Sequence, residues 1–341
     1  MQINDFSKPT IKILVTYKER HTIFKSDIIT PIQTGRAVAK EVFNEMIGDD
    51  TGDNISTRNP LYSELSAFYW AWKNYHELGN PDYIGFMHYR RQFLFNDKIL
   101  DFQQKKYASF YIFLNLDKKL KACFDDSEIR HIVPQYDYLI PDFHITPTLN
   151  VRQEYLCNIA GSKTVIFDEF IKLCYQMLPD YKEEITKLLY ADKVSICNMF
   201  VMKKELFFRY CEFAFPILFE LEKRINPRSL SANGKRFLGY MAEKLQFLFL
   251  LRLQQEKCHK SKILNCSYIL NPDGKSLHCI KLRKWLWKTL IYVPYVRIQA
   301  NKQISFYKDI EHFQREQQRI QKAFILSNLN QGLLKSPYEK D

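Results

Sequence analysis

The chain has 341 residues, of which 46% are hydrophobic, and it carries a formal net charge of +12. This length exceeds what one small core needs, so we expect one large domain with an appended tail. Eight cysteines are scattered without a Cys-x-x-Cys pair, and no signal peptide precedes the first predicted strand. The composition therefore predicts a cytoplasmic protein with reduced thiols and no zinc site.

The N-terminal segment predicts the first strand of an α/β domain. Residues 11–15 form a β-rich run that ends in Thr16, Tyr17 and Lys18 and continues into a polar segment. Many nucleotide-binding folds begin this way, but neither GxGxxG nor GxxxxGK[ST] is present in the chain. Any phosphate bound here must therefore be held by side chains.

A polar DDTGDNIS segment is followed by a predicted amphipathic helix that is rich in aromatic residues. Asn59 and Pro60 suit the helix start, because Asn accepts unpaired N–H groups and Pro fits the first helical position. Gly79 suits its end. Trp72 lies on the apolar stripe that faces a core. Trp70 projects from another face, where an indole can stack on a planar or cyclic ligand.

A short buried strand is predicted over residues 83–87, directly before the sequence His88-Tyr89-Arg90-Arg91. Ligands of open α/β sheets bind at the carboxyl ends of strands, so these polar residues are candidates for a binding site. Arginine presents a planar fork that matches phosphate oxygens. The alternative is that the two arginines cap the sheet edge or pair with surface acids.

Three blocks of the sequence together resemble a bacterial family of capsular and exopolysaccharide biosynthesis proteins, long classed as a domain of unknown function and similar to GT-A glycosyltransferases. The resemblance covers roughly residues 10–255. Its motifs are specific for the family but do not identify a sugar. The matching residues are Asp50 to Ser56, Asn59, Tyr62, Glu64 to Ala67, Tyr69, Trp70, Trp72 to Asn74, Gly85, His88 to Arg91, Phe93, Asn198 to Met202, Tyr210 to Glu212, Arg236, Gly239, Tyr240, Ala242, Glu243 and Leu245.

The resemblance implies a GT-A-like nucleotide-sugar transferase domain over residues 1–265, with a mixed central sheet, and a helical basic region over residues 266–341. It also implies an enzyme, a hexosyltransferase that moves a sugar from a nucleotide donor, with UDP the expected nucleotide, to a lipid-linked surface polysaccharide of a capsule, O-antigen or exopolysaccharide. Some similar proteins transfer galactofuranose. The alternatives are a non-catalytic glycan-binding or assembly protein and, as a third class, a basic nucleic-acid binder.

A nucleotide-sugar donor releases a diphosphate, and enzymes stabilise that charge with a metal or with fixed cations. GT-A enzymes commonly hold Mn²⁺ or Mg²⁺ on an Asp-x-Asp pair at a strand end, where this chain has His88 to Arg91. We therefore expect cations to replace the metal, with Arg90 as a catalytic residue and no cofactor. The expected donor-binding residues are Thr16, Tyr17, Lys18, Asp50, Asp53, Asn54, His88, Tyr89 and Arg91.

The rival prediction places a metal in the DDTGDNIS segment. Asp49, Asp50 and Asp53 are three carboxylates within five residues and are suited to a hard cation such as Mn²⁺ or Mg²⁺. Asp50 or Asn54 can equally cap a turn or bond to uridine or ribose.

An inverting transfer needs a carboxylate that deprotonates the acceptor hydroxyl. Glu243 is the first candidate, because an acid beside apolar residues is seldom buried without a partner. Glu243 can instead form a structural ion pair with Arg236, and Asp142 and Asp192 also remain candidates. Asn198, at the edge of a predicted core strand, and Trp70 are the expected contacts to the acceptor or sugar.

The C-terminal region carries much of the positive charge. Residues 274–308 contain eight Lys and Arg, no acid, and interleaved Trp and Tyr residues. Its uncharged run is far shorter than the ~20 residues that span a membrane. We expect residues 275–302 to lie on an anionic membrane surface, at the inner face of the bacterial cytoplasmic membrane, rather than to pack on the domain or bind nucleic acid. A helical apolar stripe follows over 306–324.

The remaining elements are predicted from periodicity alone. They are a helix over 99–126, a strand over 136–140, a helix over 165–178, a buried strand over 195–202 and a helix over 205–224 that contains Pro216.

Overall fold

The computed structural model describes residues 8–98, 106–107, 110–113, 116, 118–142, 144–145, 150–158, 162–191, 193–194 and 197–269. This part of the chain is a mixed α/β domain around a mixed central sheet, as the sequence predicts. The expected membrane-surface segment 275–302 and the helical stripe 306–324 lie outside the described residues. No helix in the described part is long and apolar enough to cross a membrane.

The central sheet has the strand order β3-β2-β1-β4-β11-β8-β12. Strands β3, β2, β1 and β4 are parallel, β11 runs antiparallel to both of its neighbours, and β12 is parallel to β8. The strand β4 therefore lies in the middle of the sheet. The strands are β1 (Ile11–Tyr17), β2 (Ile29–Gln33), β3 (Ile47–Gly48), β4 (Tyr83–His88), β8 (Tyr138–Pro141), β11 (Phe200–Lys203) and β12 (Ser261–Leu264).

A second row of strands extends from the end of β4. The chain turns from β4 into β5 (Arg91–Phe93), which pairs with β13 (Cys266–Ile269). Beyond β13 lie β7 (Phe110–Phe113) and β6 (Lys106–Tyr107). The sheet thus continues to Ile269, four residues past the expected end of the domain. A separate two-stranded sheet joins β9 (His144–Ile145) to β10 (Lys193–Val194).

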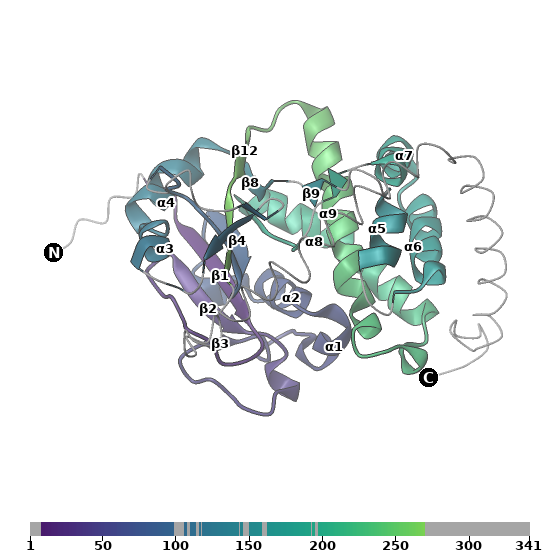
Figure 1. Ribbon diagram of the computed structural model, residues 1–341, viewed down its shortest axis with the longest axis horizontal. Helices are drawn as coiled ribbons and strands as arrows, with labels where there is room; N and C mark the ends of the chain where they lie inside the picture. Colours follow the sequence, from purple (N-terminus) through teal and green to yellow (C-terminus); the bar gives the residue numbers. More distant parts are fainter. Residues whose placement is uncertain are drawn as a thin grey trace, which may run out of the picture.

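Helices cover both faces of the central sheet (Figure 1). Helices α3 and α4 lie on one side, and α2, α8 and α9 lie on the other, with α5, α6 and α7 beyond them. The helices are α1 (Asn59–Tyr62), α2 (Leu65–Lys73), α3 (Lys118–Ala122), α4 (Asp126–Ile132), α5 (Val151–Asn158), α6 (Thr164–Met177), α7 (Lys182–Tyr190), α8 (Lys204–Arg224) and α9 (Phe237–Glu256).

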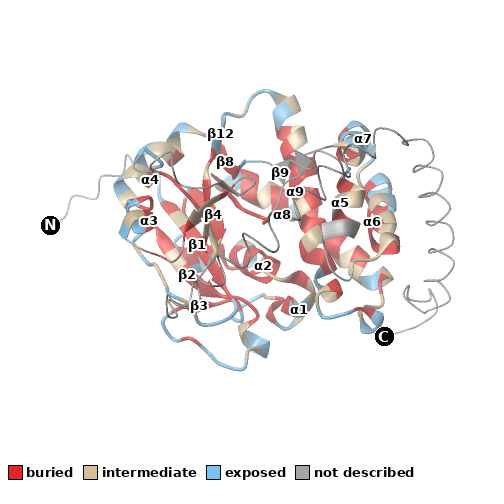
Figure 2. Ribbon diagram, in the orientation of Figure 1, coloured by how far each residue is buried: buried red, intermediate tan, exposed pale blue. Residues whose placement is uncertain are grey.

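The two faces of the sheet belong to two separate hydrophobic cores. Successive strand residues point to opposite faces, so Ile84 and Phe86 join the core under α2 and α8, and Tyr83 and Met87 join the core under α3 and α4. Both faces are buried, as Figure 2 shows. This explains why β4 is apolar without alternation up to His88.

The predicted helix from Asn59 to Gly79 is wrong in its continuity. Helix α1 ends at Ser63, whose φ of 52° breaks the helix, and a second break follows α2 before a short 3-10 turn over Tyr75–Leu78. Gly79 does end this turn, with a φ of 80°. The Asn59 side chain does not cap the helix, because its amide donates to the Ser63 carbonyl and to the Ser66 hydroxyl.

The other predicted elements hold in part. The strand at 136–140 and the helices at 165–178 and 205–224 correspond to β8, α6 and α8, and Pro216 lies inside α8. The helix predicted over 99–126 is wrong in its middle, where β6 and β7 are strands. The aromatic, β-branched composition of Phe110–Phe113 is the local signal that was overlooked.

Candidate functional site

The ends of β1 and β4 bring two predicted site residues together. The strands are parallel, and Thr16 lies opposite His88. The Thr16 hydroxyl donates to the Met87 carbonyl at 3.2 Å and lies 3.3 Å from His88 Nδ1. Thr16 is buried and Lys18, two residues later, is exposed. The carboxyl edge of the sheet therefore places His88 at the border between core and surface.

Tyr89 and Arg90 form the turn between β4 and β5, and the turn is fixed on both sides. The Tyr89 N–H donates to the Thr16 carbonyl at 3.2 Å, and the Arg90 carbonyl accepts from Ile269 N–H at 2.8 Å. The Tyr89 ring stacks on His21 with centroids 4.1 Å apart. The Arg90 guanidinium lies 5.2 Å from the centre of the Tyr89 ring.

The residues before β11 form a tight turn against the end of β4. Cys197 and Asn198 have φ values of 77° and 41°, a left-handed conformation that side chains other than Asn and Asp rarely adopt. The Cys197 carbonyl bonds to His88 Nε2, and its N–H donates to Glu243 Oε1 at 2.7 Å. Helix α9 therefore anchors the turn through Glu243.

Asn198 connects the same turn to helix α2. Its side-chain nitrogen donates to Glu64 Oε1 at 2.7 Å and to the Gly239 carbonyl at 3.0 Å. The side chain is fully buried, and its oxygen Oδ1 has no hydrogen-bond partner among the residues that the structure describes. An unpaired buried acceptor is costly, so this oxygen is a position where a ligand donor or a water is expected.

We call this group the polar cluster and define it by His88, Arg91, Cys197, Asn198, Glu64 and Glu243. Its members come from β4, β5, the turn before β11, the residue before α2, and α9. Segments that are far apart in the sequence thus meet at one end of the sheet.

Burial and charge set the protonation states in the polar cluster. Burial lowers the pKa of His88, with Glu64 acting against this effect and Arg91 adding to it. Burial raises the pKa of the Cys197 thiol to about 12, so it is a neutral thiol at pH 7. The pKa of Arg91 is raised most by the charge of Cys197, which exists only at the high pH where the arginine itself titrates, and less by Tyr268, Glu243 and Glu64, against the effect of burial. Arg91 is therefore a fixed cation beside a neutral imidazole.

Both arginines retain hydrogen-bonding capacity. The Nε atoms of Arg90 and Arg91 are buried, and neither has a hydrogen-bond partner in the described part of the chain. The Arg91 guanidinium also lies 5.3 Å from the ring centre of Tyr268 and 5.9 Å from that of Phe110. The aromatic packing holds the guanidinium in place without consuming its donors.

The first residue of the DDTGDNIS loop, Asp49, holds the loop in place through hydrogen bonds. Asp49 is fully buried, and its carboxylate accepts from Gly35 N–H at 2.8 Å, Arg36 N–H at 3.1 Å and the Ser56 hydroxyl at 2.5 Å. Gly35 has a φ of 65°, and a Cβ there would lie 2.5 Å from the Asn59 side chain. The loop therefore depends on a glycine and a buried carboxylate.

The other acids of this loop face different partners. Asp50 lies 4.0 Å from Arg36 Nε, whereas the Asp53 carboxylate accepts from the Tyr69 hydroxyl at 3.1 Å. Asn54 bonds within the loop, to Gly52 and Ser56. The three carboxylates of the rival metal site thus have three different environments.

Trp70 is placed differently from the prediction, whereas Trp72 is placed as predicted. Trp70 is 4% exposed and its indole N–H donates to the Thr51 hydroxyl at 2.9 Å, so its ring is not available for stacking on a sugar. Trp72 is partly buried and packs against the core, where its ring stacks on Phe215 with the Lys73 ammonium 3.5 Å from its centre. Trp70 is buried because α2 is covered on more than one face.

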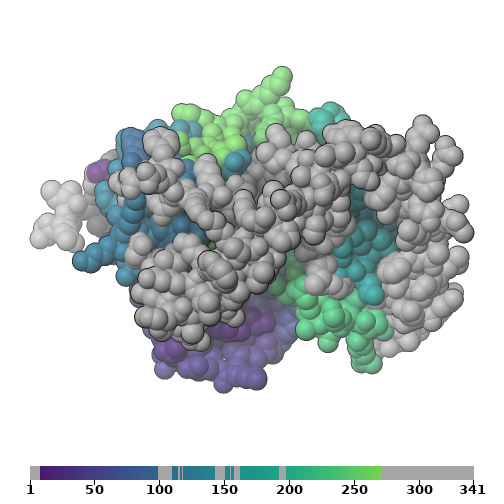
Figure 3. Space-filling view, in the orientation of Figure 1, coloured from purple at the N-terminus to yellow at the C-terminus, as the bar shows by residue number. Residues whose placement is uncertain are grey.

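Among the predicted site residues, the structure brings together Thr16, His88, Arg91, Asn198 and Glu243. Asp142 is exposed after β8, and Asp192 lies outside the described residues. The sequence alone predicts no role for Glu64, and it predicts Arg236 only as a structural partner of Glu243. The Arg236 guanidinium lies instead on Ser63, to whose hydroxyl it donates at 3.1 Å. On the surface drawn in Figure 3, the purple N-terminal segments lie beside the green segment that comes after α8 in the sequence.

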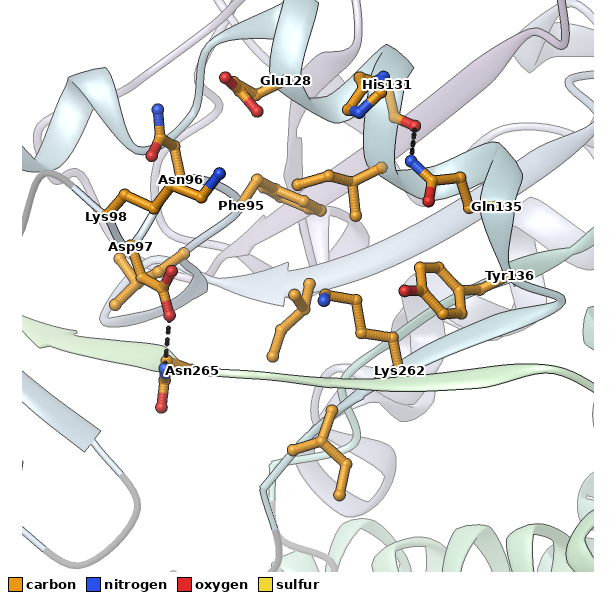
Figure 4. Close-up of a pocket in the computed structure, with 14 residues that line it drawn as sticks. Phe95, Asn96, Asp97, Lys98, Glu128, His131, Gln135, Tyr136, Lys262 and Asn265 are labelled. Carbon is orange, nitrogen blue, oxygen red and sulfur yellow. Dashed lines mark hydrogen bonds between the residues drawn. The ribbon is translucent and has the colours of Figure 1, made fainter.

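Two other features of the described part lie apart from the polar cluster. Glu256, Cys258 and His259 place ligand atoms within 4.8 Å of one another, but Glu256 is paired with Arg209. Glu256 is also roughly 20 Å along α9 from Glu243, at 1.5 Å per residue. A hollow of about 250 Å³ lies between α4 and β12 (Figure 4). No predicted site residue lines it, and its labelled polar side chains include Asp97 and Asn265, which are hydrogen-bonded at 2.7 Å.

Comparison with known proteins gives a family and a structural relative. Residues 12–255 match the family described as Domain of unknown function (DUF4422). The apo structure of the bifunctional glycosyltransferase WbbM is similar, with a TM-score of 0.71 and 31% sequence identity. The match covers 77% of this chain and 46% of that chain, so it spans less than half of the larger protein. No curated protein matches the chain.

Proposed function

The chain belongs to the family described as Domain of unknown function (DUF4422), and we propose that it is a glycosyltransferase that uses a nucleotide sugar, with UDP as the nucleotide. The donor is a hexose, such as a galactosyl or galactofuranosyl unit, and the acceptor is a lipid-linked surface polysaccharide. The observation that carries the proposal is the polar cluster. It combines a fixed cation, two carboxylates and an unpaired buried acceptor at the carboxyl end of the central parallel strands. The similarity to a glycosyltransferase supports the reaction class.

The donor diphosphate is assigned to the turn after β4. The unpaired Nε donors of Arg90 and Arg91 suit phosphate oxygens, and a guanidinium stabilises the charge that develops as the glycosidic bond breaks. His88 is neutral at pH 7 because burial lowers its pKa, so it serves as a hydrogen-bonding group. Lys18, exposed after β1, supplies a further cation at the rim.

The proposed reaction needs no metal. The hydrogen bonds of Asp49 to backbone and hydroxyl groups, and the separate partners of Asp50 and Asp53, support this reading of the loop. If Mn²⁺ or Mg²⁺ takes part, Asp50 and Asp53 are the carboxylates left to hold it.

Two carboxylates in the polar cluster, Glu64 and Glu243, are candidates for the base that activates the acceptor. Asn198 is assigned to the sugar, through its unpaired oxygen. We place the protein at the inner face of the bacterial cytoplasmic membrane, through residues 275–302.

The test is calorimetric titration of the full chain with UDP, UDP-sugars and other nucleotide sugars, first in EDTA and then with Mn²⁺. We expect micromolar binding of UDP in EDTA that Arg90→Ala abolishes. The matched control is Arg228→Ala, an exposed arginine after α8, which should bind as the wild type does.

The other outcomes discriminate between proposals. Binding that requires Mn²⁺ would move the donor site to the acidic loop. Failure of every nucleotide to bind, together with binding of an oligosaccharide, would favour a non-catalytic glycan-binding protein and contradict the transferase proposal.

A further inference from the structure

We infer that Glu64 is the catalytic base that deprotonates the acceptor hydroxyl, and that Asn198 is a positioning residue that holds Glu64 in place. This inference rests on the proposed transferase activity. Two carboxylates, Glu64 and Glu243, lie near Arg91, and the hydrogen bonds that each one makes distinguish the catalytic base from the structural residue.

Glu243 is committed to the main chain. Its Oε1 accepts the N–H of Cys197 at 2.7 Å, and its Oε2 lies 4.0 Å from the ammonium of Lys244, which is 1% exposed. Cys197 has a strained φ of 77°, and such a conformation persists only when its surroundings hold it. Glu243 therefore secures the turn that carries the Cys197 carbonyl and Asn198.

Glu64 is held by the Asn198 side chain, which donates a hydrogen bond to only one of the two carboxylate oxygens. Oε1 accepts from Asn198 Nδ2 at 2.7 Å, and no described residue donates a hydrogen bond to Oε2. The residue is half-buried and precedes α2. One oxygen is thus oriented while the other remains able to accept a proton.

The orientation of Asn198 follows from its partners. Its nitrogen faces two acceptors, Glu64 Oε1 and the Gly239 carbonyl, so an amide rotated by half a turn would place oxygen against oxygen. The side chain is buried, and asparagine tolerates its φ of 41° better than most residues. A locked neighbour of this kind keeps a catalytic group in its productive geometry before the substrate arrives.

The surroundings of Glu64 combine one fixed cation with one neutral ring. Arg91 supplies a nearby positive charge, and His88 is neutral at pH 7 because burial lowers its pKa, so it adds no second charge there. Arg236 is a second cation in the electrostatic environment of His88.

The step balances as a single displacement. The acceptor hydroxyl gives its proton to Glu64 Oε2, and its oxygen forms a bond to the anomeric carbon. The bond from that carbon to the diphosphate oxygen breaks, and the electron pair leaves with the nucleoside diphosphate. The cations after β4 then balance the charge of the leaving group.

The experiment compares Glu64→Gln with Glu243→Gln in a transfer assay, using the nucleotide sugar that binds best. Glutamine at position 64 still accepts from Asn198 but cannot take a proton. We expect kcat to fall about 10²–10⁴-fold in Glu64→Gln, the range for loss of a general base, with UDP affinity and melting temperature unchanged. Glu243→Gln, which removes the competing candidate for the base, should lower kcat less than Glu64→Gln does, by about tenfold at most, since an amide oxygen can still accept the Cys197 N–H. Glu77→Gln, an exposed residue, is the matched control.

The pH profile separates a catalytic role from a structural one. Asn198→Asp keeps the shape but places a second carboxylate beside Glu64, and a like charge disfavours ionisation. The acid limb of the kcat profile should therefore move to higher pH. Glu64→Asp keeps a carboxylate and should retain more activity than Glu64→Gln, which tests the idea even if one variant folds poorly.

Two results would overturn the inference. One is a Glu64→Gln enzyme that transfers within threefold of the wild type. The other is a loss of kcat in Glu243→Gln together with normal turnover in Glu64→Gln, which would make Glu243 the base. A wild-type protein that neither binds nor transfers a nucleotide sugar contradicts the proposed function instead, so the two failures are distinguishable.

Discussion

The acidic loop over residues 49–56 and the polar cluster are both dense in polar side chains. They differ in whether their buried polar atoms have hydrogen-bond partners. In the loop, the buried Asp49 carboxylate receives three hydrogen bonds, and Asn54 bonds to its own neighbours. In the polar cluster, the Nε of Arg91 and the Oδ1 of Asn198 are buried without partners. The loop is complete as it stands, whereas the polar cluster has hydrogen bonds left for a ligand.

This difference separates two meanings of a polar motif. A loop that leaves the core must satisfy its own backbone groups, and Asp, Asn, Ser and Gly do this well. A binding site keeps donors and acceptors unpaired, at a cost in stability that the ligand offsets. Changes in the loop should therefore affect folding, and changes in the polar cluster should affect activity.

After Glu64→Gln, the largest effect is expected from Arg91→Lys. Lysine keeps the charge but loses the fork and the Nε donor, so we expect the transfer rate to fall about 10²–10³-fold, as for the loss of one preorganised donor. Steady-state kinetics at saturating donor would measure it. The thermal unfolding midpoint serves as the control for folding. A change of less than about fivefold would show that the unpaired Nε is not directed at the substrate.

Asp49→Asn tests the acidic loop, where we expect a change in stability and none in activity. The amide has one oxygen where the carboxylate receives three hydrogen bonds, and its NH₂ group faces a donor. We expect a loss of about 2–4 kcal/mol in the free energy of unfolding, from hydrogen bonds to a buried charged group. Urea unfolding would measure it, with the exposed Asp50→Asn, expected within about 0.5 kcal/mol, as the control. Activity per folded molecule should stay the same, and its loss would move the loop into the active site.

A pH effect on stability is expected from His88. Burial lowers its pKa in the folded protein below the usual ~6.5 of an unfolded chain. The unfolded chain then binds more protons between these two pKa values, so the folded state loses stability as the pH falls from about 7 to the folded pKa. Below that pKa this contribution is constant. His88→Gln should flatten the dependence in urea unfolding between pH 5 and about 7, and an unchanged slope would show that other groups cause it.

Much of the sheet could be predicted from the sequence because it depends on local runs. β4 is a continuous apolar segment up to His88, and β1 is a β-rich run interrupted only by Lys12 before it reaches Thr16. Parallel pairing then brings Thr16 and His88 to the same edge. The sequence does not predict the break between α1 and α2, because the left-handed φ lies at Ser63 and not at a glycine or proline. Helix α2 is buried on more than one face, so Trp70 lies in the core although it is off the predicted stripe, while Trp72 packs against the core as predicted.

The candidate site was only half visible in the sequence. His88 and Arg91 follow a strand and could be identified by position alone. Glu64 could not, because the role proposed for it depends on its contact with Asn198, which lies 134 residues away. The same holds for the Glu243 bond to the Cys197 backbone, 46 residues apart. Contacts at such separations depend on the tertiary fold, and no spacing rule in one sequence encodes them.

The smallest effect is expected from Asp53→Asn, and it tests the comparison at its weakest point. Asp53 is exposed, and its carboxylate accepts one hydrogen bond from Tyr69 at 3.1 Å. Burial raises the pKa of Tyr69, and Asp53 adds to this effect, so removing the charge should bring that pKa closer to its usual value. We expect the free energy of unfolding to change by about 0.5 kcal/mol or less. A difference titration of tyrosinate absorbance against Tyr69→Phe would measure the pKa.

UDP binding to Asp53→Asn in EDTA should be unchanged, because the carboxylate already has a partner within the fold. If binding instead fell tenfold with the stability intact, Asp53 would contact the donor, and the loop would join the polar cluster as one site.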